Sequence, residues 1–201
     1  MSTPIVIGLV GRKGSGKTTA ADHLVSKHGF VKVVFAEPVK RVTEIIYGFD
    51  YDMLLGNTPE KRKLRNELRD PIWDKSPIQA MQYIGTDLFR DNMDTDVWIK
   101  IAQRKVQNLL SEGKNVVISD TRFPNEMRFI REELGGKLWA LYTDIAYLQP
   151  ISVKEIMKSD QHASEISYQS ALMEDDTRIH NPHSKDGISE LHQKIDDILN
   201  V

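Results

Sequence analysis

The chain has no cysteine among its 201 residues. Disulfide bonds, thiolate metal sites and thiol catalysis are therefore excluded, and a reducing compartment is compatible with the composition. No apolar run approaches the roughly 18 residues that a membrane-spanning helix needs, and the first residues lack the basic segment of a signal peptide. The formal net charge is only −2, so no overall basic field points to nucleic acid or a membrane surface as a partner. We expect a cytoplasmic protein.

Internal repeats and low-complexity segments are also absent, and the length suggests one domain with a possible lid. Apolar runs separated by helical patterns predict an α/β fold, with a parallel sheet of about five strands flanked by helices. The expected strands are residues 5–10, 31–36, 115–119, 137–142 and, more weakly, 177–180. The expected helices include residues 17–28, residues 37–49 and a last helix from about Ser189.

Two segments interrupt this alternation of strands and helices. Residues 50–112 carry helical patterns without a convincing strand, and residues 148–172 are polar. We interpret the first as a helical substrate-binding insertion and the second as a lid. The remaining segments, residues 1–49, 113–147 and 173–201, then form the core of a single domain.

Residues 11–18, GRKGSGKT, match the phosphate-binding pattern G-x-x-x-x-G-K-[ST] between a buried strand and a helix. Glycines allow the backbone to form a nest of N–H groups, and the helix N-terminus adds positive potential. Lys17 would reach the β- and γ-phosphates, and Thr18 would ligate Mg²⁺. A chance glycine turn is the alternative, as is a solvated loop charge for Lys13. The expected nucleotide-binding residues are Gly11, Lys13, Gly14, Ser15, Gly16, Lys17, Thr18 and Thr19.

An acidic residue should follow a neighbouring strand in such a protein, and NVVISD supplies Asp120. Its carboxylate could hold Mg²⁺; the alternative is an N-cap of the helix that begins near Pro124. Arg122, from the same strand end, could steady the transferred phosphate. Glu126 could accept a hydrogen bond from a sugar hydroxyl or orient an arginine.

The class of P-loop protein can be narrowed further. There is no N-K-x-D motif of a GTPase, and motor ATPases usually need a longer chain, so phosphoryl transfer to a small acceptor fits best. In the insertion, Ser76 and Pro77 indicate a helix start. Gly85 costs about 1 kcal/mol relative to alanine in a helix, which suggests close approach of a ligand or of another helix. The candidate acceptor-binding residues are Gln82, Gly85, Thr86 and Arg90, with Trp98 either a wall against a nucleobase or a residue at the edge of the core.

The elements GRKGSGKTT, FAEPVK, SPIQAMQYIGTDLFR, DVWI, SDTRFPNE and DQHASE together resemble the deoxynucleoside monophosphate (dNMP) kinases of bacteriophages and large viruses. The resemblance covers most of the chain. It implies a nucleoside monophosphate kinase-like P-loop fold that transfers the γ-phosphate of ATP to dNMPs with Mg²⁺. It also implies a homodimer and, for a viral chain, the host cytoplasm.

The resemblance also implies roles for individual residues. Lys17 and Thr18 bind the ATP phosphates and Mg²⁺. The acceptor phosphate and the metal lie near Asp120, Arg122 and Glu126. Asn181 borders the adenine. His162 and Glu165 match a lid element of unassigned role. The base and sugar pocket comprises Gln82, Gly85, Thr86 and Trp98. Lys40 would face the acceptor; the alternative is a solvated lysine on its helix.

One position departs from the family pattern, because Ile78 stands where an arginine often holds the acceptor phosphate. The missing charge would come from Arg90, Lys40 or the basic run at residues 60–69. The alternative for this run is an amphipathic helix, with its charged face solvated and with Leu64 and Leu68 packed inward. Two alternatives stay open. The acceptor could be dephospho-coenzyme A or phosphomevalonate, or the chain could be a non-catalytic nucleotide-binding module.

Overall fold

The computed structural model describes residues 3–144, 167–182, 184 and 186–200. The chain divides into two compact units: Met1–Val34 with Gln103–Val201, here called the sheet unit, and Phe35–Ala102, the helical unit. Most of the lid predicted at residues 148–172 lies outside the described residues, as do His162 and Glu165. Within the described ranges, no helix has both the length and the apolar character that crossing a membrane requires.

The sheet unit is built on a five-stranded sheet in the order β2-β3-β1-β4-β5. All neighbouring strands run parallel, which confirms the predicted fold class. The first strand, β4 and β5 lie where the apolar runs predict them, whereas β2 and β3 are shorter. The strands are β1 (Val6–Val10), β2 (Val31–Val33), β3 (Val116–Ile118), β4 (Lys137–Tyr142) and β5 (Thr177–His180).

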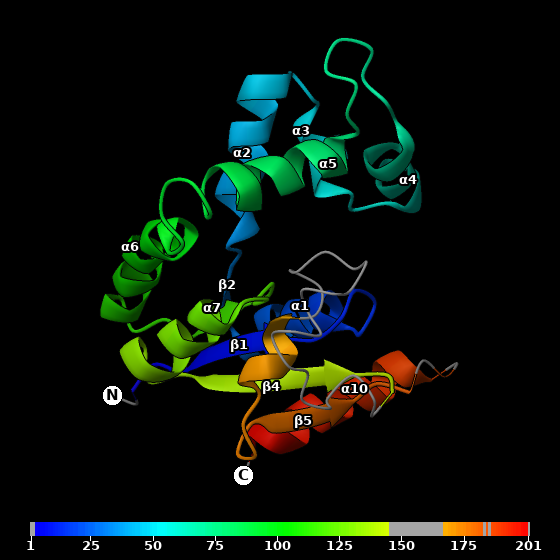
Figure 1. Ribbon diagram of the computed structural model, residues 1–201. Helices are drawn as coiled ribbons and strands as arrows, with labels where there is room; N and C mark the ends of the chain where they lie inside the picture. Colours follow the sequence, from blue (N-terminus) through cyan, green and yellow to red (C-terminus); the bar gives the residue numbers. More distant parts are fainter. Residues whose placement is uncertain (1–2, 145–166, 183, 185, 201) are drawn as a thin grey trace. The chain divides into compact units, whose positions relative to one another are not determined.

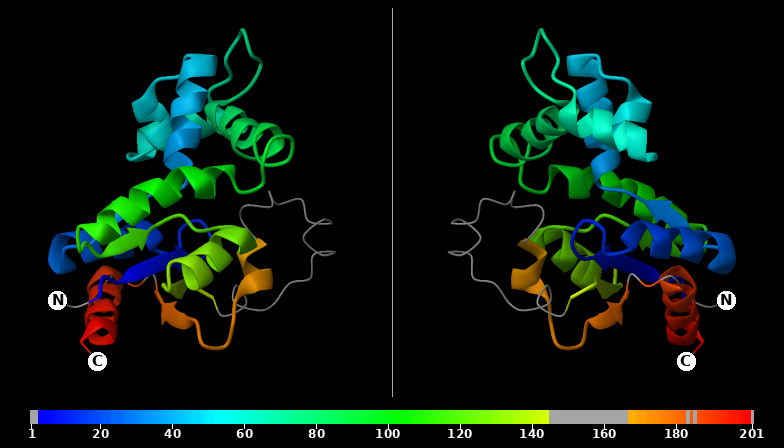
Figure 2. Two further views of the ribbon diagram at one scale, coloured as in Figure 1. Left: turned by 90° about the vertical axis from the view of Figure 1, so that its left-hand side faces the viewer. Right: turned by 90° about the vertical axis from the view of Figure 1, so that its right-hand side faces the viewer.

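Helices cover both faces of this sheet. Ile7 and Leu9 of β1 point to a buried cluster with residues of α1 (Lys17–His28) and α10 (Gly187–Leu199). Gly8, between them, faces the other way, because a Cβ there would lie 2.5 Å from Cδ1 of Ile130. Ile130 belongs to η2 (Phe129–Glu133), a π-helical continuation of α7 (Pro124–Arg128). Figures 1 and 2 show α10 and α7 on these opposite faces.

The helical unit encloses a core of its own. Its elements are α2 (Ala36–Tyr47), α3 (Tyr51–Leu55), α4 (Pro59–Glu67), α5 (Pro77–Gln82), η1 (Tyr83–Leu88) and the first part of α6 (Val97–Ser111). The buried cluster joins Val39 of α2, Leu54 of α3, Ile84 of η1 and Trp98 of α6. The unit begins at Phe35, so α2 belongs with the helices that follow it.

Helix caps in the helical unit follow local sequence. Ser76 accepts a hydrogen bond from the backbone N–H of Gln79, and the Gln79 side chain accepts one from the N–H of Ser76, which completes a capping box. Thr58 likewise accepts from the N–H of Lys61. The helix start predicted at Ser76 and Pro77 is confirmed, and a proline stands in the first turn of both helices.

The predicted inward packing of α4 is wrong. Leu64 and Leu68 are 49% and 39% exposed, and α4 contains no buried residue. An amphipathic pattern indicates which side of a helix could be buried, but burial also requires a second apolar surface opposite it. The basic run is therefore a solvated helix with two exposed leucines.

Candidate active site

The predicted phosphate loop and Asp120 follow adjacent strands. Strand β1 pairs with β3 in parallel, with Gly8 opposite Ile118. The loop begins directly after β1, and Asp120 stands two residues after β3. Because the carboxyl ends of parallel strands lie at the same edge of the sheet, the two segments meet there, where open α/β sheets bind their ligands.

Two glycines of the loop show why this turn needs them. Gly11 has a φ of 137°, and a Cβ there would lie 2.2 Å from the carbonyl oxygen of Leu141. Gly14 has a φ of 87°, but no described atom lies within 4 Å of the place a Cβ would take. Gly11 is therefore required by packing against the protein, whereas Gly14 faces open space with a backbone conformation that other residues rarely adopt.

Lys17 folds back over the loop. Its Nζ donates hydrogen bonds to the carbonyl oxygens of Gly11 at 2.5 Å and Arg12 at 2.8 Å. The helix α1 starts at Lys17 with Gly16 as N-cap and without a capping side chain. Thr18 is exposed in the first turn. A positive side chain and an uncapped helix N-terminus are thus placed together, which is the arrangement that binds phosphate.

Ser15 adds an unusual polar atom to the loop. Its Oγ is buried and, among the described residues, has no hydrogen-bond partner. A buried hydroxyl without a partner costs free energy, so such atoms in native proteins usually mark a place for a ligand or water. The loop therefore fits a phosphate-containing ligand, as the sequence predicts.

Asn181 supports the loop from the end of β5, the strand at one edge of the sheet. It directly follows β5, is 9% exposed, and its Nδ2 donates to the carbonyl oxygen of Ser15 at 3.2 Å. Its backbone N–H donates to the carbonyl oxygen of Tyr142 at 2.8 Å. Asn181 is thus a positioning residue for the loop, a role that the sequence did not reveal. Its predicted place beside the adenine stays a prediction.

The segment after β3 is held by Glu126. The Oε2 of this residue accepts hydrogen bonds from the backbone N–H groups of Arg122 at 2.7 Å and Phe123 at 3.0 Å. Glu126 is 3% exposed, and α7 begins at Pro124. The N-cap position of α7 is Phe123, so the alternative interpretation of Asp120 as the N-cap of this helix is wrong. The metal role of Asp120 stays a prediction.

The backbone of Arg122 is fixed from a second side, because the hydroxyl of Ser167 donates to its carbonyl oxygen at 3.3 Å. Two other arginines of the sheet unit have structural roles. Arg131 donates to the carboxylate of Asp176 and to a backbone carbonyl, and Arg178 donates to two backbone carbonyls. The role predicted for Arg122 at the transferred phosphate stays a prediction.

Gly85 and Trp98, predicted for the acceptor pocket, are joined inside the helical unit. The indole Nε1–H of Trp98 donates to the carbonyl oxygen of Gly85 at 2.8 Å, and its ring contacts Phe89 at 5.2 Å between centroids. A Cβ on Gly85 would lie 3.3 Å from Cγ1 of Val39, so the close neighbour at Gly85 is α2. Trp98 is only 3% exposed, which favours its interpretation as a core residue.

The other predicted acceptor residues also lie in the helical unit. Gln82 and Thr86 are partly exposed where α5 passes into the π-helical η1, and Lys40 is partly exposed on α2, next to the Val39 that meets Gly85. Arg90 is buried, at 6% exposure.

Replacement of Trp98 by phenylalanine is expected to lower the free energy of unfolding by about 1–2 kcal/mol, because the carbonyl of Gly85 loses its donor. Denaturant unfolding would measure this loss, with the more exposed Trp73→Phe as the matched control. Unchanged stability together with a raised KM for the acceptor would contradict the core role and make Trp98 a ligand contact.

Comparison with known proteins gives matches along the whole chain. The family model "Deoxynucleotide monophosphate kinase" matches residues 57–195. A protein of Acanthamoeba polyphaga mimivirus, provisionally named a deoxynucleotide monophosphate kinase, is 32% identical over 202 residues, which cover 96% of each chain. The deoxynucleoside-5′-monophosphate kinase of Escherichia phage T5 is 33% identical over 91 residues, 45% of this chain and 34% of that protein.

Among solved structures, the dephospho-CoA kinase from Campylobacter jejuni is 19% identical and has a TM-score of 0.49. The match covers 99% of this chain and 97% of that chain. A likeness at this level does not bear on the choice of acceptor.

Proposed function

We propose, since the chain belongs to the deoxynucleotide monophosphate kinase family, that it transfers the γ-phosphate of ATP to the 5′-phosphate of deoxynucleoside monophosphates in the presence of Mg²⁺. One observation carries the ATP side of this proposal. The loop at residues 11–18 has Lys17 folded over its carbonyls at the start of α1, beside the strand end that bears Asp120.

The phosphate loop would hold the nucleotide through backbone N–H groups, with Lys17 exchanging its carbonyl partners for phosphate oxygens. The buried Oγ of Ser15 and the open space at Gly14 support this fit. Lys13 within the loop and Thr19 directly after it would add contacts to the phosphates. Because Asn181 holds the carbonyl of Ser15, the loop keeps its shape while Lys17 moves.

A magnesium ion bound to ATP would neutralise charge on the β- and γ-phosphates. Thr18, exposed at the first turn of α1, and Asp120, after β3, supply hydroxyl and carboxylate oxygens. These are the ligand types that Mg²⁺ prefers, and a few protein ligands suffice because the ion keeps several waters. The two residues therefore fit the metal predicted for this site.

The acceptor needs no general base, because the second pKa of a phosphate monoester is about 6 and the group is largely dianionic at neutral pH. Positioning and charge neutralisation would carry the catalysis. In this proposal Arg122 meets the transferred phosphoryl, with its backbone held by Glu126 and Ser167. Lys40 and Arg90 would contribute charge for the acceptor phosphate.

For the base and sugar of the acceptor, Gln82 and Thr86 offer an amide and a hydroxyl on partly exposed positions. Trp98 and Gly85 would support these two side chains, because the hydrogen bond from Trp98 to the carbonyl of Gly85 fixes the turn that carries Thr86. Neither a non-nucleotide acceptor nor a non-catalytic role is favoured by the family match.

The acceptor is tested by a coupled assay of ADP release with ATP and Mg²⁺. The panel holds the four dNMPs, the corresponding ribonucleotides, dephospho-coenzyme A and phosphomevalonate, with each product identified by mass. Formation of deoxynucleoside diphosphates is expected. Transfer only to a non-nucleotide acceptor would overturn the acceptor assignment, and nucleotide binding without any transfer would overturn the catalytic one.

The loop itself is tested by Gly14→Ala, with Gly113→Ala as matched control. Both glycines have a positive φ and no described atom near the added Cβ, so each substitution should cost a similar ~1–2 kcal/mol of backbone strain. Only Gly14→Ala is expected to weaken ATP binding, by about tenfold or more, in calorimetric titration. Equal ATP affinity in the two variants would contradict the placement of phosphate at Gly14.

A further inference from the structure

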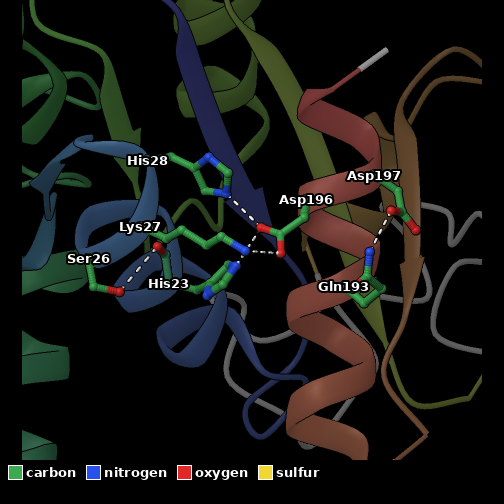
Figure 3. A network of polar contacts seen from close by, with 7 residues as sticks. All are labelled: His23, Ser26, Lys27, His28, Gln193, Asp196 and Asp197. Carbon is green, nitrogen blue, oxygen red and sulfur yellow. Dashed lines mark hydrogen bonds and ion pairs between the residues drawn. The ribbon is translucent and has the colours of Figure 1, made fainter.

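A polar cluster joins α1 to α10, the two helices that pack on the same face of the sheet (Figure 3). Its centre is Asp196 of α10, whose carboxylate is contacted by three side chains of α1. Nε2 of His23 lies 2.8 Å and Nε2 of His28 lies 2.7 Å from the same oxygen, Oδ1, while Nζ of Lys27 lies 2.7 Å from Oδ2. The ring of His192, one turn before Asp196, stacks on His23 at 3.9 Å between centroids.

Two imidazole nitrogens and one carboxylate oxygen thus converge on one small volume. The three atoms lie within 4.8 Å of one another. In a tetrahedral zinc site, with bonds of about 2.0–2.1 Å, ligand atoms lie roughly 3.3 Å apart. To reach that spacing, the distances from Oδ1 to the two nitrogens need to lengthen by about 0.5 Å. The two nitrogens, within 4.8 Å of each other, need to approach by up to about 1.5 Å.

The surroundings of the cluster also suit a cation. The carboxylate of Asp196 already holds the ammonium of Lys27. The cluster also stands at the C-terminal end of α1, where the helix dipole favours positive charge.

We propose that His23, His28 and Asp196 form a binding site for a divalent transition-metal ion of the zinc class. Two imidazoles and a carboxylate are ligands that Zn²⁺ accepts, and Mg²⁺ avoids nitrogen. Lys27 leaves the carboxylate when the metal binds; its side chain is 57% exposed, so its ammonium can turn to solvent. Water takes the fourth position.

This site is distinct from the phosphate loop. Both lie on α1, but at 1.5 Å per residue His23 and His28 stand roughly 9 and 16 Å along the helix from Lys17. A metal there would fasten the last helix to α1 and so stabilise the support of the loop. Its role is structural, and it does not depend on the proposed kinase reaction.

Titration of the full chain with Co²⁺ and Zn²⁺ tests the proposal, after a chelator has been dialysed away. The buffer contains excess Mg²⁺ and no nucleotide, so that oxygen-rich sites are occupied by Mg²⁺. We expect one ion per chain, the visible absorption of four-coordinate Co²⁺, and a rise in Tm with Zn²⁺.

Asp196→Asn and His28→Gln should each weaken binding by at least about tenfold, whereas the controls Asp197→Asn and His180→Gln should bind like the wild type. His28 is a sound choice where Asp196→Asn harms folding, because it stands at the end of α1 with 19% of its side chain exposed. Absence of stoichiometric binding would overturn the proposal, leaving a charge cluster that joins two helices. Equal binding by all variants would overturn it as well.

Discussion

Replacement of Lys17 by alanine is expected to lower kcat/KM for phosphoryl transfer by at least ~10³-fold. The ammonium of Lys17 already lies against the loop, where it donates hydrogen bonds to the carbonyl oxygens of Gly11 and Arg12. Loss of a single preorganised group that stabilises transition-state charge costs about 10²–10³-fold, and Lys17 would also contribute to binding of the ATP phosphates. Steady-state kinetics with varied ATP would measure the loss.

Lys114→Ala is the matched control for Lys17→Ala, because it removes an exposed lysine from the same unit. Thermal unfolding of both variants separates folding from function, since Lys17 also links two loop carbonyls. A Lys17→Ala protein that folds and retains more than a tenth of wild-type kcat/KM would contradict the assignment of this residue.

Asp120→Asn is expected to lower kcat by about 10²–10³-fold and to raise the Mg²⁺ concentration needed for half-maximal rate. The amide keeps the shape of the side chain but removes the negative charge that attracts the metal. Thermal unfolding of the variant checks that the fold is retained. Kinetics across a series of Mg²⁺ concentrations would show both effects.

The exposed Asp175 of the sheet unit offers the matched control, Asp175→Asn, which should leave the Mg²⁺ dependence unchanged. An Asp120→Asn variant with normal kcat and normal Mg²⁺ dependence would show that the metal is held elsewhere. A large loss of stability would instead show that Asp120 supports the fold.

Much of the sheet unit is predictable from the sequence because its signals are local. A continuous apolar run, three loop glycines and Gly29 at the end of α1 set β1, the phosphate loop and α1 without any knowledge of distant residues. Asp120 could be placed because a carboxylate that follows the neighbouring strand has a known position in parallel sheets.

The helical unit is less predictable because the burial of its side chains depends on contacts with residues distant in sequence. Gly85 is compatible with a ligand or a second helix, and only the structure shows Val39 beside it. Leu64 and Leu68 follow an amphipathic pattern but are 49% and 39% exposed. The same limit hides the contact of Asn181 with the loop and that of Asp196 with His23, which are 166 and 173 residues apart in sequence.

The central claim is that the chain moves the γ-phosphate of ATP onto a dNMP at this loop, and ³¹P NMR of the reaction mixture tests it most directly. With wild-type protein, ATP, Mg²⁺ and one dNMP, the account predicts that the dNMP resonance is replaced by the two coupled resonances of a dNDP as ADP forms. The Lys17→Ala protein should leave the spectrum unchanged over the same time. Inorganic phosphate in place of dNDP, or equal transfer by the two proteins, would contradict the account.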